Sequence, residues 1–127
     1  MRATLPLPPS LNAAYRSVTI RGHGRVLLSK DGRKYKEDVK KLLAGHKSLC
    51  SARLEVTYTY YFKDKRKNDL ANREKLLSDA LEGIIFDNDS QIDRMTLVRG
   101  GIDKDNPRVE IEVNSIEIAV GAVGGKW

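Results

Sequence analysis

The stretch 53–62 has the clearest pattern in the chain, because apolar and polar side chains alternate along it. One face carries only apolar or aromatic side chains: Leu54, Val56, Tyr58, Tyr60 and Phe62. Period-two alternation with β-branched and aromatic residues is typical of a half-buried strand. We therefore expect these tyrosines to pack in the core and not to serve as stacking platforms for bases.

Two stretches have helical spacing instead. The first is predicted to run from the N-cap Ser29 to about residue 47, with an apolar stripe of Tyr35, Val39, Leu42 and Leu43. The second is predicted to begin at Asn68 or Asp69 and to end near Gly83. Its apolar positions recur at helical intervals: Leu70, Leu77, Leu81 and Ile84. Both stripes should face a common core.

The remaining segments complete the fold prediction. Residues 2–7 should form a short strand that the prolines stop, at a sheet edge or at a strand end, and residues 91–99 and 108–114 two further strands. Ser10–Gly24 has no clear period and is predicted to be an exposed loop. Residues 100–107 should link the last two strands as a hairpin. The order β-α-β-α-β-β predicts an α+β domain, a mixed sheet with two helices packed on it.

The size of the chain suits one domain, which we predict to cover residues 1–127. The apolar phase slips after Asn114, so residues 114–127 are expected to be an extension whose register the pattern does not fix. A single cysteine excludes an internal disulfide, and no apolar run is long enough for a membrane span. We expect a cytoplasmic protein with no membrane partner. The net charge of +6 alone leaves a solvated surface and a nucleic-acid partner equally open.

Candidate chemistry gathers around the start of the second helix. The cations of residues 63–67 lead into Asp69, Lys75 lies further along the helix, and Asp89 follows it. Carboxylates such as Asp69 and Asp89 can hold Mg²⁺, which activates water and polarises a phosphate. Lys75 could then stabilise charge in the transition state, while the basic run holds the flanking phosphates. This pattern predicts metal-assisted phosphodiester hydrolysis.

A structural explanation of the same residues stays open. Asp69 then caps a helix, residues 87–89 form an ordinary acidic turn, and Lys75 is a solvated helix lysine.

Several short motifs resemble one family, in chain order. They comprise the proline-rich start Leu5–Ser10 with Asn12, Tyr15 and Arg16; Ser29–Gly32 with Tyr35; Arg66–Asn72 with Lys75; Asp79–Leu81; and Asn88, Asp89, Gln91 and Asp93. Over about residues 4–113 the chain resembles the RusA-type Holliday-junction endonucleases of bacteria and phages. The resemblance implies a small α+β homodimer that resolves four-way DNA junctions in recombination and repair, in a bacterial or phage-infected cell.

The resemblance also implies the cofactor and the site. Two strands would be nicked symmetrically with Mg²⁺, for which Mn²⁺ is an alternative ion. Asp69 and Asp89 would bind the metal, and Lys75 would be the essential cation. The cations that we expect to contact DNA are Arg16, Lys30, Lys65, Arg66, Lys67 and Arg73.

One departure from the family pattern matters most. The pattern Asp-Leu-Asp-Asn reads Asp69-Leu70-Ala71-Asn72 here, so a second metal-binding carboxylate is missing at Ala71. Either the acid was replaced by engineering or a natural member has lost it; the first is favoured, because every neighbouring residue fits the intact pattern. We expect a chain that binds junctions but cuts them poorly. The alternatives are a non-catalytic protein that binds junction or duplex DNA, and an unrelated basic domain that binds RNA or a protein.

Overall fold

Strand β4 (Leu54–Phe62) occupies an inner position of the main sheet. The structure is a computed structural model that describes residues 1–66 and 69–116. The main sheet has the order β1-β6-β4-β5, with β1 spanning Arg2–Pro6, β5 Ile92–Ile102 and β6 Arg108–Ser115. β4 pairs in parallel with β5 and antiparallel with β6, so the sheet is mixed. The predicted α+β class, the mixed sheet and the edge position of β1 are confirmed.

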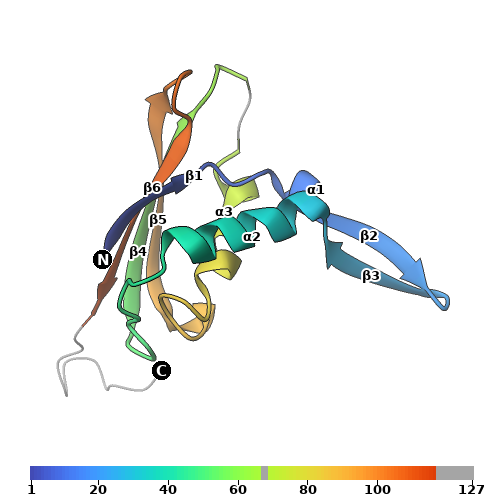
Figure 1. The fold of residues 1–127 in the computed structure, drawn as a ribbon, viewed down its shortest axis with the longest axis horizontal. Coiled ribbons are helices and arrows are strands. Elements are labelled where there is room, and N and C mark those ends of the chain that lie inside the picture. Colours follow the sequence, from blue (N-terminus) through green and yellow to red (C-terminus); the bar gives the residue numbers. More distant parts are fainter. Residues whose placement is uncertain (67–68, 117–127) are drawn as a thin grey trace.

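Two helices lie against one face of this sheet (Figure 1). α2 (Lys30–Leu42) contributes Tyr35 and Val39 to the core, and α3 (Ala71–Leu81) contributes Leu76, Leu77, Ala80 and Leu81. Every second residue of β4 is buried beneath them, as the alternation predicted. Tyr58 and Tyr60 are fully buried, which confirms that they pack in the core.

The helix boundaries differ from the prediction. Ser29 caps α2 as expected, because its hydroxyl accepts a hydrogen bond from the Gly32 amide at 3.1 Å. The helix ends at Leu42 and not near residue 47, and the Leu42 side chain is 53% exposed instead of lying on the buried stripe. A turn in which Gly45 takes φ 89° follows, a conformation that ends helices readily. α3 ends as predicted, with Gly83 at φ 79° just beyond its last turn.

The predicted loop Ser10–Gly24 is wrong. Its residues form a short helix, α1 (Leu11–Ala14), and most of a hairpin made of β2 (Tyr15–Ile20) and β3 (His23–Leu28). Figure 1 shows this hairpin extending away from the sheet and the helices. The two turn residues, Arg21 and Gly22, take φ 51° and 79°, as a tight hairpin turn requires. Residues 15–28 show no period-two pattern, because neither face of the hairpin is buried in the core.

The predicted hairpin through residues 100–107 is also wrong. β5 continues through the two glycines to Ile102, and β5 and β6 lie on opposite sides of β4. β6 carries buried Val109, Ile111 and Val113, which pair with Tyr60, Tyr58 and Val56 of β4. Most of β5 is exposed. The two most apolar strands therefore pair in the interior, and β5 takes the edge. The slip in apolar phase was predicted after Asn114; β6 continues to Ser115, and from residue 117 onward the predicted extension lies outside the described part of the chain.

Among the described residues, no helix combines the length and the apolar character that crossing a membrane would need.

Candidate active site

The middle of α3 is fixed to β4 by a buried polar chain. The Ser78 hydroxyl donates to Glu74 Oε1 at 2.6 Å and lies 2.9 Å from the Tyr58 hydroxyl. Ser78 is 2% exposed and Tyr58 is fully buried, and burial raises the pKa of Tyr58 well above its ordinary value. Because buried polar groups are costly unless they are paired, these hydrogen bonds fix the rotation of α3 on the sheet.

That rotation directs Lys75 and Asp79 toward the root of the hairpin. Lys75 Nζ forms an ion pair with Asp79 Oδ2 at 3.3 Å, one helical turn away. The Tyr15 hydroxyl donates to the same oxygen at 2.5 Å, and Lys75 Nζ lies 5.1 Å from the centre of the Tyr15 ring. Burial, and then the hydrogen bond to Asp79, raise the pKa of Tyr15 far above its ordinary value. Tyr15 is therefore a hydrogen-bond donor, and Lys75 sits between an anion and an aromatic face.

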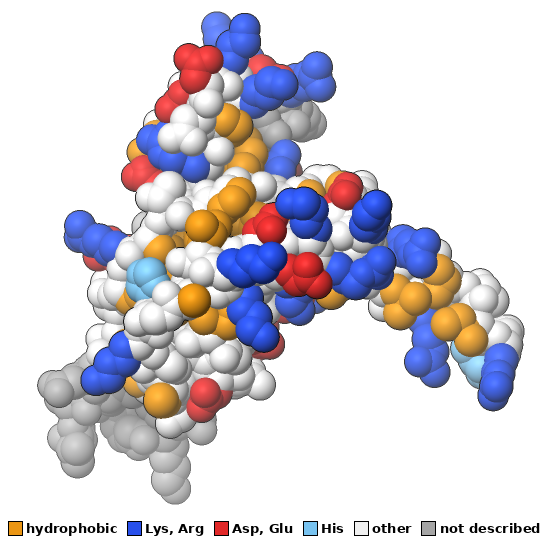
Figure 2. Space-filling view, in the orientation of Figure 1, with side chains coloured by type: hydrophobic (Ala, Val, Ile, Leu, Met, Phe, Trp, Pro, Cys, Tyr) orange, Lys and Arg blue, Asp and Glu red, His pale blue; other side chains and the backbone are white. Residues whose placement is uncertain are grey.

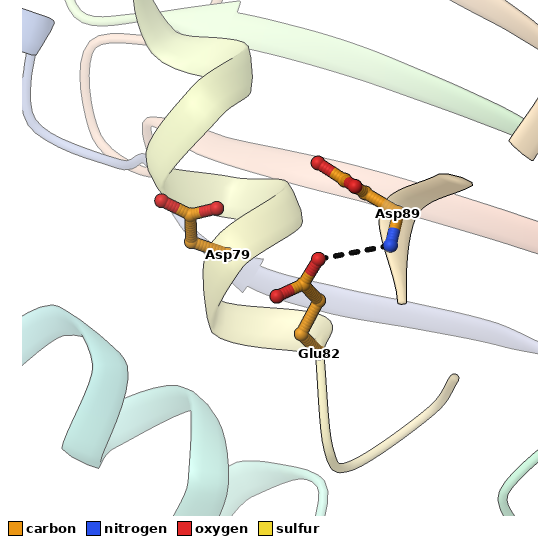
Figure 3. Close-up of side chains that lie close together, drawn as sticks. All are labelled: Asp79, Glu82 and Asp89. Atoms are coloured by element: carbon orange, nitrogen blue, oxygen red, sulfur yellow. Dashed lines mark hydrogen bonds between the residues drawn. The ribbon is translucent and has the colours of Figure 1, made fainter. Parts of the chain in front are cut away.

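Asp89 meets two acids of α3. Its carboxylate lies near those of Asp79 and Glu82, and one ligand oxygen from each residue falls within 4.8 Å of the others (Figure 3). The Asp89 amide also donates to Glu82 Oε1 at 2.8 Å. Asp89 is exposed, while Asp79 and Glu82 are half-buried. We call Asp79, Glu82 and Asp89 the acidic trio.

Asp89 lies in a short turn that side-chain hydrogen bonds of Asn88 and Gln91 stabilise. It opens a 3₁₀ helix, η1 (Asp89–Gln91), which Asn88 caps by accepting from the Ser90 amide at 2.9 Å. The Gln91 side chain accepts from the amides of Asp87 and Asn88 and donates to two carbonyls of the 50–52 segment. A buried Gln91 thus joins the acidic turn to the chain before β4. The turn is therefore held in place by side-chain hydrogen bonds to another segment of the chain.

The mouth of α3, which we define as residues 69–72, is simpler. The helix begins at Ala71, two or three residues later than predicted, and Leu70 stands at the cap position with no side-chain cap bond. Asp69 Oδ1 accepts from the Ala71 amide at 3.0 Å, so Asp69 does bond to the first turn. Asp69 and Ala71 are both exposed, and Asp69 does not belong to the acidic trio. Its proposed pairing with Asp89 stays a prediction.

Most of the cations expected to contact DNA lie on the surface. Arg16 on β2, Lys30 at the start of α2, and Lys65 and Arg66 before α3 are all exposed. Figure 2 shows Lys and Arg side chains gathered over the loop at the top, α2 and the hairpin. Arg66 also pairs with Asp64, Nε to Oδ2, at 3.5 Å. Lys67 lies outside the described residues.

Arg73 differs from these cations. Its guanidinium donates to the Pro8 carbonyl oxygen and lies 5.5 Å from the centre of the Phe62 ring. The side chain is partly buried, and desolvation lowers the pKa of Arg73. These contacts tie the proline-rich start of the chain to α3 and β4. A DNA contact by Arg73 stays a prediction, and its described contacts are internal.

The structure therefore brings Lys75 and Asp89, two of the three predicted catalytic residues, to one neighbourhood through Asp79. Sequence reasoning assigned no role to Asp79, Glu82 or Tyr15. The four-residue spacing of Lys75 and Asp79 was the available signal, since it places them on one helix face. Tyr15 and Asp79 both belong to the matching motifs, but nothing in the sequence indicated that they bond to each other across 64 residues.

The donor set of the acidic trio suits a hard divalent cation. Mg²⁺ takes carboxylate oxygens and keeps several waters, so a few acids close together suffice. Glu82 and Asp89 are the members whose side chains have no lysine partner among the described ion pairs. Asp79 Oδ2 already accepts hydrogen bonds from Tyr15 and Lys75. Negative charge and an ammonium group thus meet on one side of α3.

The fold and this site define a class: a small basic α+β domain in which three acids and a lysine lie close together. A family model described as "Endodeoxyribonuclease RusA" matches residues 6–114, so the chain belongs to the RusA endodeoxyribonuclease family. The resemblance inferred from the short motifs is confirmed, and the family is one of nucleases. A comparison with curated proteins finds none that matches.

Proposed function

We propose that this chain binds four-way DNA junctions and cuts two of their strands symmetrically with Mg²⁺, and that Ala71 impairs the cutting. Membership of the RusA family supports nuclease action on junctions. The structural observation that carries the proposal is the convergence of Lys75 and Asp89 on Asp79, because a phosphodiester held there would meet an ammonium and carboxylates together.

Each part of the site has a role in this proposal. Asp69 and Asp89 hold the metal, and Glu82 adds a carboxylate beside Asp89. Mg²⁺, when bound, supplies an activated water and a Lewis acid at the phosphate. Lys75 stabilises the additional negative charge of the pentacovalent transition state. The exposed cations Arg16, Lys30, Lys65 and Arg66, with Lys67, neutralise backbone phosphates on either side of the scissile bond.

Ala71 is the reason for the expected impairment. It is the first residue of α3 and is exposed, so a carboxylate at this position would face solvent beside Asp69. A methyl group cannot ligate a metal, and the site therefore has one acid fewer than the family pattern. The chain should keep its affinity for DNA, because removing a carboxylate also removes repulsion from phosphates.

The decisive experiment restores the acid. End-labelled synthetic four-way junctions are incubated with Mg²⁺ and with the chain as it stands, with Ala71→Asp, or with Ala71→Asn. The asparagine has the size of aspartate without its charge, so it is the matched control. We expect Ala71→Asp to cut two strands symmetrically, on the order of 100-fold faster than the other two forms. Duplex DNA should remain uncut.

Two results would contradict the proposal. Equal cutting by the present chain and by Ala71→Asp would show that position 71 does not limit the reaction. Failure of every form to cut, with tight junction binding, would favour the second candidate function: a protein that binds junctions without cleaving them. The absence of the expected acid at Ala71 is the observation that supports this second candidate.

A homodimer is part of the proposal for a geometric reason. A junction with near two-fold symmetry is cut at two equivalent phosphates, which requires two equivalent sites. Sedimentation of the free protein and of its junction complex checks this. A single copy per junction would contradict it.

A further inference from the structure

The ammonium group of Lys75 is held from two directions. Nζ lies 3.3 Å from Asp79 Oδ2 and 5.1 Å from the centre of the Tyr15 ring. The side chain is 58% exposed, and a lysine with that much exposure ordinarily samples many rotamers on its flexible stem. Here an anion and an aromatic face restrict it together.

Tyr15 also holds the Asp79 carboxylate in place. Its hydroxyl donates to the Asp79 oxygen that pairs with Lys75, at 2.5 Å, so one carboxylate oxygen serves both groups. Tyr15 itself is well anchored, because its amide donates to the carbonyl of Leu11, the first residue of α1, and β3 pairs beside it. The Ser29 amide donates to the Ala14 carbonyl at 2.8 Å, which ties the root of the hairpin to α2.

A pocket opens at this point. It is lined by residues of α1 and of the hairpin, among them Tyr15, Arg16, Ser17 and Val26, and by Lys75 of α3. An exposed arginine and an ammonium group at one opening are the groups that meet a DNA backbone. Along the described part of the hairpin, residues 15–28 include no acid that would oppose a phosphate.

We propose that Tyr15 and Asp79 are positioning residues, which hold the Lys75 ammonium toward the pocket where the cleaved strand enters between the hairpin and α3. The inference rests on the proposed function, in which Lys75 stabilises the transition state. In this role Tyr15 and Asp79 act through Lys75 and not on the reacting atoms, although an oxygen of Asp79 lies within 4.8 Å of one of Asp89. The hairpin thereby fixes the geometry of the lysine, since Tyr15 is its first residue. Misplacing a catalytic group by about 1 Å can cost on the order of 100-fold in rate.

The simpler explanation is that the bond between Tyr15 and Asp79 only fastens the hairpin. The two explanations differ in what happens to Lys75. A fastening bond affects stability alone, whereas a positioning bond also changes the environment of Lys75 and the chemical step, with junction affinity little changed.

The test compares two Tyr→Phe substitutions that each remove one hydrogen-bonding hydroxyl. Tyr15→Phe removes the bond to Asp79. The control, Tyr35→Phe, removes the bond from the buried Tyr35 hydroxyl to the Pro6 carbonyl, 2.8 Å long. NMR of the side-chain ammonium and ε-methylene groups, assigned through Lys75→Gln, reports the environment of Lys75 in the chain as it stands, without DNA or metal.

A second measurement uses the Ala71→Asp form. Single-turnover cleavage of a four-way junction and junction affinity are measured for this form alone and with each Tyr→Phe change. We expect Tyr15→Phe to shift the Lys75 signals toward those of a solvated lysine and to slow cleavage about tenfold or more, with affinity changed less than about twofold. Tyr35→Phe should leave the Lys75 signals and the cleavage rate in place while it lowers stability.

Three outcomes overturn the inference. Unmoved Lys75 signals in Tyr15→Phe would show that Tyr15 does not hold the ammonium, whether or not the protein cuts DNA. Shifted signals with an unchanged cleavage rate would show that the position of the ammonium does not matter, and the proposed function would stand without the inference. Absence of cleavage by Ala71→Asp with Tyr15 intact would overturn the proposed function and the inference with it.

Discussion

The two ends of α3 are built differently. The body of α3, from Glu74 onward, carries buried leucines and the hydrogen bonds that join Glu74, Ser78 and Tyr58. It also carries the contacts that link Lys75, Asp79 and Tyr15. The mouth carries exposed Asp69 and Ala71, and the Asp69 side chain accepts a hydrogen bond from the Ala71 amide. The buried contacts are therefore gathered in the body of α3, and the position of the missing acid lies at its exposed mouth. Truncating buried leucines in the body should change the free energy of unfolding, whereas changing Ala71 at the mouth should leave it nearly unchanged and, under the proposed function, change activity.

The largest expected effect comes from alkaline pH, and it acts on the tyrosines buried against the body of the molecule. Burial raises the pKa of Tyr35, Tyr58 and Tyr60 above the ordinary value of 10.0. The folded state therefore keeps phenol protons that the unfolded chain releases. Stability should be fully present below pH 10 and should be lost as pH rises above it.

Urea denaturation followed at a series of pH values around 10 measures this loss, and absorbance of tyrosinate reports when the phenols ionise. We expect ionisation of these tyrosines to coincide with unfolding. In Tyr58→Phe, the decline above pH 10 should be shallower. Complete ionisation of all tyrosines in a protein that keeps its folded circular dichroism would contradict the prediction.

The next largest effect is expected from cavity formation in the body of α3. Leu77 is fully buried, so Leu77→Ala should lower the free energy of unfolding by about 2–5 kcal/mol. The matched control is Leu42→Ala, because Leu42 is 53% exposed on α2 and its truncation should change stability by no more than about 0.5 kcal/mol. Urea denaturation of both variants decides this. Similar losses for the two leucines would break the contrast.

A third prediction separates two cations near the mouth. Arg73 donates to the Pro8 carbonyl and lies over Phe62, so Arg73→Ala should cost about 1–2 kcal/mol of stability. Lys65 is exposed, so Lys65→Ala should leave stability unchanged. It should instead weaken junction binding and reduce the salt dependence of log K by about one unit. The reverse pattern would mean that Arg73, and not Lys65, belongs to the DNA-binding surface.

The smallest effect is expected at the mouth. Without metal, Ala71→Asp should change the free energy of unfolding by no more than about 0.5 kcal/mol, with a slight gain at low salt from the helix dipole. Thermal melting in a chelating buffer at low and high salt measures it. A loss above about 1 kcal/mol would show that the mouth of α3 is packed and not open, and the contrast between its two ends would fail.

Most of the elements that the sequence predicted are those that bury apolar side chains in the core. β4, both main helices and the edge strand followed from the apolar periods of residues that face the core. The hairpin did not, because side chains such as Val26 and Ile20 are exposed and leave no alternation. The position of β5 at the edge was also out of reach, since pairing between distant strands is decided by which of them buries the more apolar face.

The same limit applied to the site. Asp69, Lys75 and Asp89 stood out because cations and acids lie near them in the sequence, and the family resemblance supported them. The structure adds Glu82 and Asp79 beside Asp89, and Tyr15 beside Lys75, through contacts that join separate elements. Side chains that come together only through the tertiary fold carry no local signal.

The parallel pairing of β4 and β5 has a consequence for how the molecule comes into being. Parallel neighbours cannot be joined by a tight turn, and the chain that connects these two strands includes α3, the acidic turn and η1. Lys75, Glu82 and Asp89 all lie on this connection. Until this long-range pairing forms, the connection is not held against the sheet, so we expect the site to reach its final geometry late in folding.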